Sequence, residues 1–387
     1  MSMSFKSRQE YLEAKRQQYW QASSRGDKAK ILDEVESTLG YHRKHLIRIL
    51  NKPTAIKQKK QNRPKPLKYQ EALPTIELVW KALDYVCAER LHPVLASTAE
   101  RLSQFGELTL TPQVIRQLEE ISRPTLGRYL ASLDSPKAKR RFPSVKPSTL
   151  KSAIPIDRYD WDESRPGALE IDLVEHNGGD SSGHYAYTLS VVDIVSGYSL
   201  RRAILGKAQA VVHAALKEIL TDWPFTPWGL HCDNGPEFLN DQLARFCKAE
   251  SFSFSRSRPY KKNDNAHVEQ KNRQYVREIV GYERYDTPEE VAWLNEIYEY
   301  VDLYANLILP MRKVVSKKRI GKRIKKQFDT ARTPFQRLLE AGVLSEEKAQ
   351  QLRDIQAYLN PLEIRRTLDT LLARSPVYQQ KKEPIFN

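Results

Sequence analysis

The pattern of apolar residues between positions 168 and 272 constrains the fold more than any other feature of the chain. It predicts three strands, then a helix, a strand, a helix, a strand and a final helix. The predicted strands cover 168–174, 183–194, 197–205, 228–232 and 252–255, and the predicted helices cover 208–221, 239–249 and a segment that begins near Glu269. This order predicts a mixed five-stranded sheet covered by helices.

Three acidic residues lie in three different elements of this pattern. Asp172 lies within the first strand, in the apolar run 168–174. Asp233 follows the apolar run 228–232 and precedes strong turn residues, so it lies at the carboxyl end of a strand. Thirty-five residues separate Asp233 from Glu269, which lies in the first turns of a predicted helix. Acids that converge from separate rigid elements can hold two divalent cations about 4 Å apart.

Three sequence runs resemble the catalytic core of bacterial insertion-sequence transposases of the retroviral-integrase superfamily: DNGPEF, RSRPYKKNDNAHVEQKN and VREIVGYERY. The resemblance covers about residues 160–310 and implies an RNase H-like core. It implies a DDE polynucleotidyl transferase that cuts transposon ends and joins the freed 3′-hydroxyl to target DNA. It also implies that Asp172, Asp233 and Glu269 are the catalytic residues and the ligands of two Mg²⁺ ions, for which Mn²⁺ can substitute.

The helix that begins near Glu269 is expected to contact DNA. Many members of the family have a basic residue seven positions after the glutamate, where this chain has Val276. Arg273 and Arg277 lie four and eight positions after Glu269, on the same helix face, and either is a candidate for the contact. The loop before the helix supplies three further candidates: Arg258, Lys261 and Lys262.

Other polar residues near the acids have a simpler interpretation. A single acidic residue in a strand or at a helix start is usually a solvated charge or a cap, and it is the combination of three that favours chemistry. Glu175 is expected to face away from Asp172 because strand side chains alternate. His176, His231 and His267 lie near the acids in sequence, and packing is the favoured role for each.

The charge of the chain fits a polyanionic partner. It has 63 Lys and Arg residues against 48 Asp and Glu, a formal charge of +15 and a pI of about 9.5. Three basic segments hold much of the excess: 56–68, 137–151 and 312–326. Prolines make the first two extended linkers, whereas the third, which contains Gly321, is either a hairpin or a loop. Each segment fits a solvated linker as well as a DNA contact.

Two helical modules before the core have the pattern of helix-turn-helix proteins. In the first, Asp27 is expected to cap a helix that ends at Gly40, and a basic helix follows over 41–51. In the second, Ser122 is expected to cap the last helix. The second helix of such a motif enters the major groove of double-stranded DNA. The predicted DNA contacts are Arg43, Lys44 and Arg48 in the first module and Arg123, Thr125 and Arg128 in the second.

These features predict a multidomain protein with two all-α modules, an α/β core and a mainly helical C-terminal tail. The predicted parts are a helix-turn-helix module at 1–53, a basic linker at 54–70, a second such module at 71–134, a basic linker at 135–158, the RNase H-like core at 159–310, and a basic segment with a helical region at 311–387. Tail helices are predicted at 333–344, 345–359 and 361–373.

The remaining features bear on location and assembly. Cys87, Cys232 and Cys247 show no pairing pattern, which suits a reducing cytosol. No apolar run approaches the ~18 residues of a membrane span, so we expect no membrane contact and a bacterial cytoplasmic protein, associated with the nucleoid when bound to DNA. Symmetric joining of two transposon ends predicts a homo-oligomer, at least a dimer on DNA.

Two alternative functions remain open from the sequence. A transposase-derived DNA-binding regulator without activity would retain both helical modules, but the complete set of acids argues against it. An RNase H-type nuclease would hydrolyse nucleic acid without joining it, but the two candidate end-binding modules argue against that reading. A metal-dependent cleavage assay and a strand-transfer assay with a pre-cut end separate these alternatives.

Overall fold

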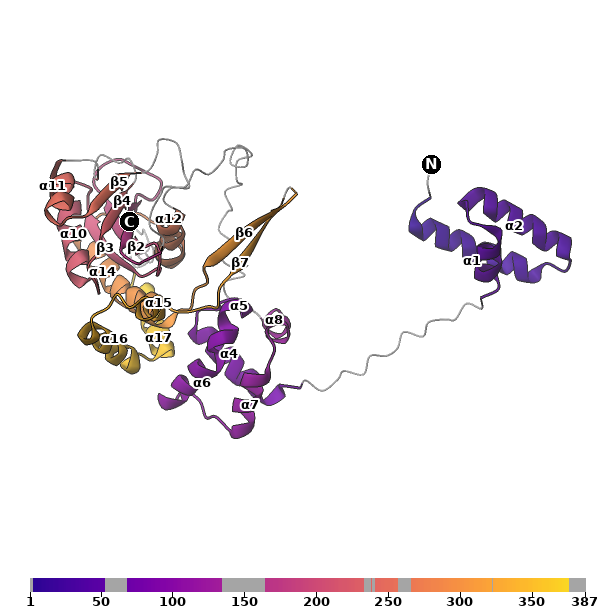
Figure 1. The fold of residues 1–387 in the computed structure, drawn as a ribbon, viewed down its shortest axis with the longest axis horizontal. Helices are drawn as coiled ribbons and strands as arrows, with labels where there is room; N and C mark the ends of the chain where they lie inside the picture. The colour runs from indigo at the N-terminus through magenta and orange to yellow at the C-terminus, as the bar shows by residue number, and fades with distance from the viewer. Residues whose placement is uncertain are drawn as a thin grey trace, which may run out of the picture. The chain divides into compact units, whose positions relative to one another are not determined.

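A computed structural model describes residues 3–52, 68–133, 164–232, 238, 241–256, 266–321 and 323–375. The chain divides into two compact units, Met1–Leu67 and Lys68–Asn387. Figure 1 shows the elements of both units.

The N-terminal unit is a three-helix module. Its helices are α1 (Phe5–Gln21), α2 (Arg25–Leu39) and α3 (Arg43–Leu50), and its small core contains Tyr19, Leu32, Val35, Leu46 and Leu50. The predicted cap at Asp27 is wrong, because Ser24 Oγ accepts a hydrogen bond from Asp27 N at 3.0 Å. Both residue types cap helices well, and an acid in the first turn also favours the helix dipole. Gly40 ends α2 as predicted, with a left-handed φ of 68°.

The second unit begins with a set of short helices. They are α4 (Leu73–Ala82), α5 (Ala88–Leu91), α6 (Leu95–Gln104), α7 (Pro112–Glu120) and α8 (Arg123–Leu130). Thr111 caps α7 through a hydrogen bond from Val114 N at 3.2 Å, and Ser122 occupies the N-cap position of α8. Proline follows each of these cap residues within the first turn, where its missing N–H costs nothing.

The centre of the second unit is a five-stranded sheet with the order β3-β2-β1-β4-β5. Its strands are β1 (Ala168–Glu175), β2 (Ala186–Asp193), β3 (Ser199–Leu205), β4 (Gly229–Cys232) and β5 (Ser253–Arg256). The first three strands pair antiparallel, whereas β4 pairs parallel with β1 and with β5. This mixed sheet confirms the predicted RNase H-like core (Figure 1).

Alternation along the strands gives the sheet two apolar faces. Leu169 and Ile171 of β1 share a core with helices α10 (Gln209–Asp222) and α11 (Asp241–Ala249). Val174 belongs to the core of the other face. That face is covered by α12 (Ala266–Asn272), the π-helix η4 (Arg273–Arg277), α13 (Glu278–Val280), α14 (Pro288–Leu303) and the π-helix η5 (Tyr304–Ile308). The central strands β1 and β2 are thus covered on both faces of the sheet.

The C-terminal region starts with a β-hairpin and continues with three helices. The hairpin consists of β6 (Val314–Ile320) and β7 (Arg323–Phe328), so the basic segment is a hairpin and not a loop. The helices are α15 (Pro334–Ala341), α16 (Glu346–Tyr358) and α17 (Pro361–Ala373), close to the predicted positions.

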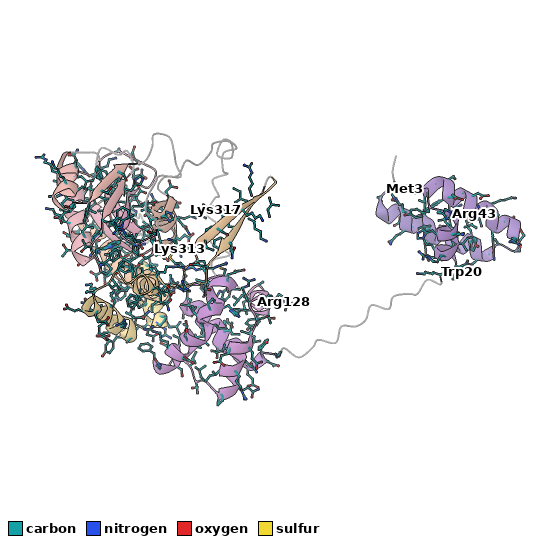
Figure 2. The ribbon with its side chains drawn as sticks, in the orientation of Figure 1. Met3, Trp20, Arg43, Arg128, Lys313 and Lys317 are labelled. Atoms are coloured by element: carbon teal, nitrogen blue, oxygen red, sulfur yellow. The ribbon has the colours of Figure 1, made fainter. Side chains whose placement is uncertain are left out.

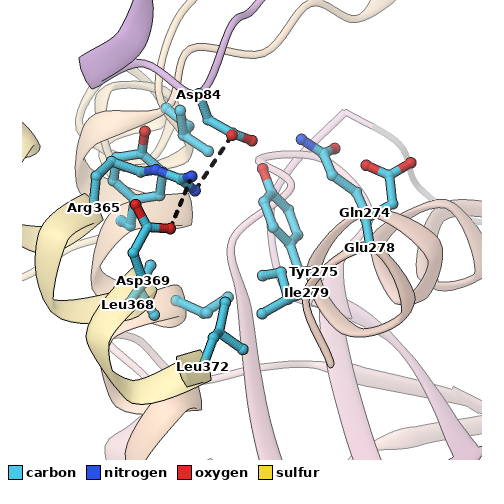
Figure 3. Close-up of a pocket in the computed structure, with 12 residues that line it drawn as sticks. Asp84, Gln274, Tyr275, Glu278, Ile279, Arg365, Leu368, Asp369 and Leu372 are labelled. Atoms are coloured by element: carbon cyan, nitrogen blue, oxygen red, sulfur yellow. Dashed lines mark ion pairs between the residues drawn. The ribbon is translucent and has the colours of Figure 1, made fainter. Parts of the chain in front are cut away.

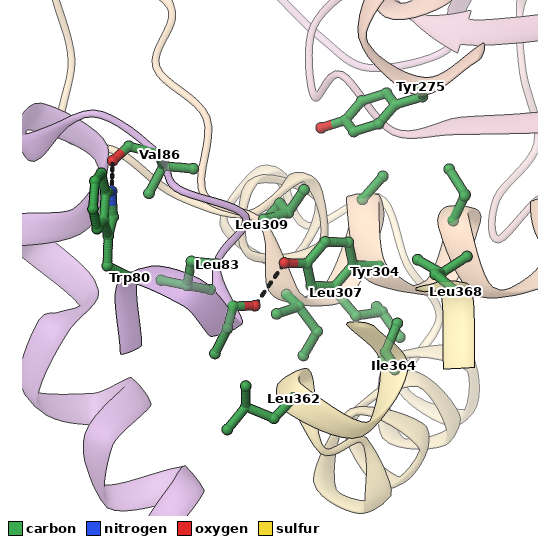
Figure 4. Packing of buried hydrophobic residues seen from close by; sticks show 14 of the residues in the cluster. Trp80, Leu83, Val86, Tyr275, Tyr304, Leu307, Leu309, Leu362, Ile364 and Leu368 are labelled. Atoms are coloured by element: carbon green, nitrogen blue, oxygen red, sulfur yellow. Dashed lines mark hydrogen bonds between the residues drawn. The ribbon is translucent and has the colours of Figure 1, made fainter. Parts of the chain in front are cut away.

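The helices of residues 68–133 share one hydrophobic core with the sheet and the C-terminal helices. Leu83, Leu307, Leu362 and Leu368 belong to this cluster, and Figure 4 shows their packing. The hydroxyl of Tyr304 donates a hydrogen bond to Ala82 O across 2.6 Å in the same region. A continuous core of this kind joins segments that lie far apart in the sequence into one packed body.

The structure also bears on membrane-spanning helices and on the exposure of the three cysteines. Within the described ranges, no helix has the length and apolar character needed to cross a bilayer. Cys232 and Cys247 are buried, and Cys87 is exposed.

Candidate active site

An open pocket of about 400 Å³ lies at the carboxyl half of β1, beside the first turns of α12. Two of the three predicted acids line it, Asp172 from β1 and Glu269 from α12. Its wall consists of Asp172, Leu173, Val174, Glu175, Asn177, Glu269, Asn272, Arg273 and Arg277. The pocket therefore combines carboxylates with arginines, a set of groups suited to cations and phosphates.

The alternation of β1 explains why Asp172 faces helix α12. Glu170 and Asp172 lie two residues apart and so point to the same face of the sheet. Glu170 Oε2 accepts a hydrogen bond from Val268 N at 2.8 Å, and Asp172 Oδ2 accepts one from Asn272 Nδ2 at 2.8 Å. The strand and the helix that present Asp172 and Glu269 are therefore tied together at two points.

Glu170 is a buried carboxyl that the sequence analysis did not select. Burial raises its pKa to about 8, although the backbone N–H groups of Val268 and His267 oppose the shift, and the nearby charges of Glu269 and Asp172 add to it. Its position two residues before Asp172 on the same strand face is the sequence signal that identifies it. Its hydrogen bond with Val268 N ties Glu170 to the backbone directly before Glu269.

Asn272 is a second residue of the site that sequence reasoning missed. Its side-chain nitrogen binds Asp172, while Asn272 Oδ1 is buried and has no hydrogen-bond partner among the described residues. A buried amide oxygen without a partner costs free energy unless another group satisfies it. Asn272 lines the pocket together with Asp172 and Glu269, and amide oxygens, like carboxylates, are ligands of hard cations.

The two arginines after Glu269 both reach the pocket, but they lie in different environments. Arg273 is 74% exposed in its side chain and lies 3.6 Å from the carboxylate of Glu278. Arg277 donates a hydrogen bond to Glu175 O at 2.7 Å, and its guanidinium lies 4.6 Å from the ring centre of Tyr282. Burial lowers the pKa of Arg277. Val276 is 0% exposed, so that position cannot reach a bound molecule.

The π-helix η4 changes the geometry behind the predicted arginine face. The expected four- and eight-residue spacing assumes regular α-helix throughout, whereas residues 273–277 follow i→i+5 bonding. Arg273 and Arg277 both line the pocket, as the predicted shared face requires, and Tyr275 and Val276 of the same turn are buried. π-helical turns of this kind often occur at functional sites.

The histidines have the packing roles that the sequence favoured, with one exception. His176 is buried and its Nε2 lies 2.7 Å from Thr188 Oγ1; burial, together with the charge of Arg277, lowers its pKa to about 3. His231 is buried with its Nδ1 2.9 Å from Ser255 Oγ. His267 is exposed in the first turn of α12.

Glu175 lies at the pocket even though its side chain belongs to the other face of the strand. Leu173, Val174 and Glu175 are consecutive and all contact the pocket, so the pocket meets both faces of β1 where the strand ends. Glu175 is paired loosely with Lys207, whose Nζ lies 3.9 Å from its carboxylate.

Four predicted site residues lie outside the described residues: Asp233, Arg258, Lys261 and Lys262. The described part of β4 ends at Cys232, immediately before Asp233. Register pairs Glu170 of β1 with His231 of β4, so the two strands run side by side and parallel toward the pocket.

The residues of the helical modules that are predicted to contact DNA differ in their exposure and in their contacts within the protein. Arg43 forms ion pairs with Asp33 and with Glu36, so it stabilises its own module, whereas Lys44 and Arg48 are exposed (Figure 2 labels Arg43). In α8, Arg123 and Arg128 are exposed and Thr125 is half-buried. Arg128 Nη2 donates to Thr125 Oγ1 at 3.1 Å.

A second, smaller pocket lies behind the π-helix η4, where the helical segment 68–133 meets α17 (Figure 3). It has about 50 Å³ of space and is lined by Gln274 and Tyr275 of η4. Arg365 spans it, with Nη1 3.3 Å from Asp84 and Nη2 3.5 Å from Asp369. The paired charges and the small volume make it a structural junction.

No protein-family model matches the chain. The catalytic core domain of HTLV-2 integrase in complex with magnesium aligns with 38% of this chain and 91% of its own, at 15% identity and a TM-score of 0.29. The catalytic core domain of BIV integrase aligns with 46% of this chain and 95% of its own, at 15% identity and a TM-score of 0.30.

A relative in sequence covers almost the whole chain. The uncharacterized protein y4rM of Sinorhizobium fredii is 33% identical over 342 residues, which are 87% of this chain and 96% of y4rM. Identity at this level over this length shows common descent and a common fold. The chain therefore belongs to the family of y4rM.

Proposed function

We propose that this protein is a metal-dependent DDE polynucleotidyl transferase, and specifically a bacterial insertion-sequence transposase. It would cut double-stranded DNA at transposon ends and join the freed 3′-hydroxyl to target DNA. One observation supports this most strongly: Asp172 and Glu269, selected from sequence spacing, line the same open pocket on adjacent elements. Their two elements are held together by the Asn272–Asp172 and Val268–Glu170 hydrogen bonds.

The oxygen atoms around the pocket fit a hard divalent cation. Carboxylates of Asp172 and Glu269 and the unpartnered Asn272 Oδ1 are the ligand types that Mg²⁺ prefers. Asp233 is proposed as the third acidic ligand because it directly follows Cys232 at the end of a strand parallel to β1. Two bound Mg²⁺ ions, or Mn²⁺ in their place, would supply Lewis-acid stabilisation of the phosphate and a more acidic attacking water or hydroxyl.

The residues of the chain have separable roles in this proposal. Asp172 and Glu269 bind and orient the cations, and Glu170 and Asn272 hold those two acids in place. Arg273 is extended into solvent at the pocket wall and would bind a DNA phosphate. Arg277 is the less exposed of the pair and supports the end of β1 through Glu175 O.

DNA recognition in this proposal comes from the helical segments. Lys44 and Arg48 of α3 and Arg123 and Arg128 of α8 are exposed cations on short helices that follow a turn. Arg258, Lys261 and Lys262 would brace the strand beside the site. Two ends joined symmetrically require at least a dimer on DNA.

The test is metal-dependent cleavage of labelled duplex DNA taken from the sequences that flank the gene, where the proposal expects inverted repeats. Asp172→Asn, Asp233→Asn and Glu269→Gln should each lower the cleavage rate by more than about a hundredfold, because each removes a charge that holds the cation. Binding of the same DNA should persist. The matched control is Glu218→Gln, an exposed carboxylate of α10 outside the pocket.

A strand-transfer assay with a pre-cut end then separates the possible activities. Joining of the pre-cut end by the unchanged protein supports a transposase. Cleavage without joining would identify a hydrolytic nuclease, and DNA binding with neither reaction would identify a regulator. Undiminished Mg²⁺-dependent nicking by Asp172→Asn and Asp233→Asn would contradict the assignment of the acids.

A further inference from the structure

The β6–β7 hairpin is an arm whose strands are open to solvent along their length. Every residue of β6 is exposed, and the exposed apolar side chains include Val315, Ile320 and Ile324. Figure 1 shows the hairpin extending away from the helices. Figure 2 labels Lys313, which directly precedes β6 at the base of the hairpin, and Lys317, which lies on β6. An isolated two-stranded hairpin is marginally stable in water, so its structure needs support from elsewhere.

That support comes from the base of the hairpin. Lys313 Nζ donates to Ile194 O at 2.6 Å in the turn between β2 and β3, and Lys313 N donates to Asp329 Oδ1 at 2.7 Å. Asp329 is paired in turn with Arg337 of α15 at 2.6 Å. Gly197 allows this close approach, since a Cβ there would lie 2.5 Å from Met311 Sδ. The arm is thus fixed to the catalytic sheet at one end only.

The charge along the arm has a single sign. Residues 312–328 contain no acidic residue and nine lysines and arginines. The register places Lys317 opposite Lys326 and Lys318 opposite Lys325. Neighbouring pairs in a ladder point to opposite faces, so each face of the ribbon presents two directly opposed lysines. Like charges directly opposite each other destabilise a hairpin.

We infer that the β6–β7 hairpin binds double-stranded DNA as a two-stranded ribbon placed in a groove, with Lys317, Lys318, Lys325 and Lys326 on the phosphates. A two-stranded ribbon fits the width of the major groove, and phosphates on both sides would neutralise lysines on both faces. Ile320 and Ile324, which flank the turn, would meet base edges or sugars. The choice of DNA as the polyanion rests on the proposed function.

A simpler reading is that the lysines only prevent other chains from pairing with the exposed strand edges. Charges of either sign would do this, and alternating signs would also stabilise the cross-strand pairs. The hairpin instead places four like charges in two opposed pairs, an arrangement that a polyanion between or around them stabilises. The rigid base at Lys313 and Asp329 would hold this arm in one orientation relative to the sheet.

The experiment compares two variants of the full chain. The hairpin variant carries Lys317→Gln, Lys318→Gln, Lys325→Gln and Lys326→Gln, and the control variant carries Lys217→Gln and Lys248→Gln on α10 and α11, where both lysines are exposed. Binding to a fluorescent duplex is measured without divalent metal over a range of salt concentrations. The hairpin variant should bind more weakly, with the slope of log affinity against log salt reduced by about 3. The control should change the slope by less than 1.

Further measurements exclude misfolding and other partners. The melting temperature of the hairpin variant without DNA should be equal to or above that of the unchanged protein, because opposed lysines have been removed. A slope equal to the control's would overturn the inference. The inference would also be overturned if the hairpin variant lost as much affinity for single-stranded DNA as for duplex DNA. The same holds if it lost affinity only for phosphatidylserine vesicles. Because no metal is present, failure of DNA cleavage would count against the proposed activity and not against the arm.

Discussion

Asn272 donates a hydrogen bond from its side-chain amide to Oδ2 of Asp172 across 2.8 Å, and this bond joins helix α12 to strand β1 at the pocket. Together with the bond from Val268 N to Glu170, it fixes the two elements that present Asp172 and Glu269. The acids are therefore held near each other by contacts within the protein. Such preorganisation lowers the cost of gathering like charges when a cation binds.

We predict that Asn272→Ala lowers metal-dependent activity by about ten- to a hundredfold, the usual effect of removing a residue that orients a metal ligand. The concentration of Mg²⁺ needed for half-maximal cleavage should rise in parallel. Gln270→Ala, an exposed position two residues earlier on the same helix, is the control and should leave both quantities unchanged. An unaltered Mg²⁺ requirement in Asn272→Ala would show that the amide does not orient Asp172.

We predict that His176 makes stability depend on pH. Its pKa is about 3 in the folded protein against 6.5 for a free side chain, so below pH 6.5 the unfolded chain binds a proton that the folded one rejects. The free energy of unfolding should fall by about 1.4 kcal/mol per pH unit as the pH drops from 6.5 toward 3. Urea unfolding at a series of pH values measures this slope.

The comparison for His176 uses two variants. His176→Asn should flatten the slope in that window, whereas His184→Asn, at an exposed position, should leave it as in the unchanged protein. Parallel slopes for the protein and both variants would assign the acid sensitivity to other groups.

We predict that the two pocket arginines separate into a binding and a structural residue. Arg277→Gln should lower the free energy of unfolding by about 1 to 3 kcal/mol, because it leaves Glu175 O without its donor. Arg273→Gln should leave stability within about 0.5 kcal/mol and reduce the salt slope of DNA binding by about 1. Thermal unfolding and DNA titrations on both variants measure the difference. The reverse pattern would assign the phosphate contact to Arg277.

We predict that residues 68–133 unfold together with the five-stranded sheet. Tyr304→Phe removes the 2.6 Å hydrogen bond to Ala82 O and should cost about 1 to 3 kcal/mol. Tyr358→Phe is the control, since that side chain is 85% exposed. Calorimetry should detect one transition for this unit in every variant, lowered only by Tyr304→Phe. A separate low-temperature transition for the helices of 68–133 would contradict the shared core.

The elements of the core could be predicted from the sequence because their residues act locally. Alternation around Asp172 identifies its strand and its face, and the turn residues before Glu269 place that acid at a helix start. Residues 314–328 combine exposed basic residues with Gly321 and fit a hairpin or a loop equally well by local pattern. Only the structure distinguishes the two, because it shows β6 paired antiparallel with β7.

The contacts around the acids could not be predicted in the same way. The bond between Asn272 and Asp172 joins residues one hundred positions apart, and no local pattern encodes it. The π-helix η4 also has no simple sequence signature, so the sequence predicts a regular α-helix over residues 273–277. Amphipathic stripes show that α4 is buried on one side, but they do not reveal that Leu307 and Leu362 lie in the same core.

The shared core has a consequence for distances along DNA. Helix α8 and the sheet that bears Asp172 belong to one packed unit. If the protein acts as proposed, a DNA sequence bound by Arg123 and Arg128 would therefore lie at a set separation and a set rotational phase from the phosphate that is cut. The protein would then fix the number of base pairs between the recognised sequence and the cut site. Inserting about 5 base pairs, roughly half a helical turn, between recognised sequence and cut site would turn the phosphate to the opposite side of the duplex.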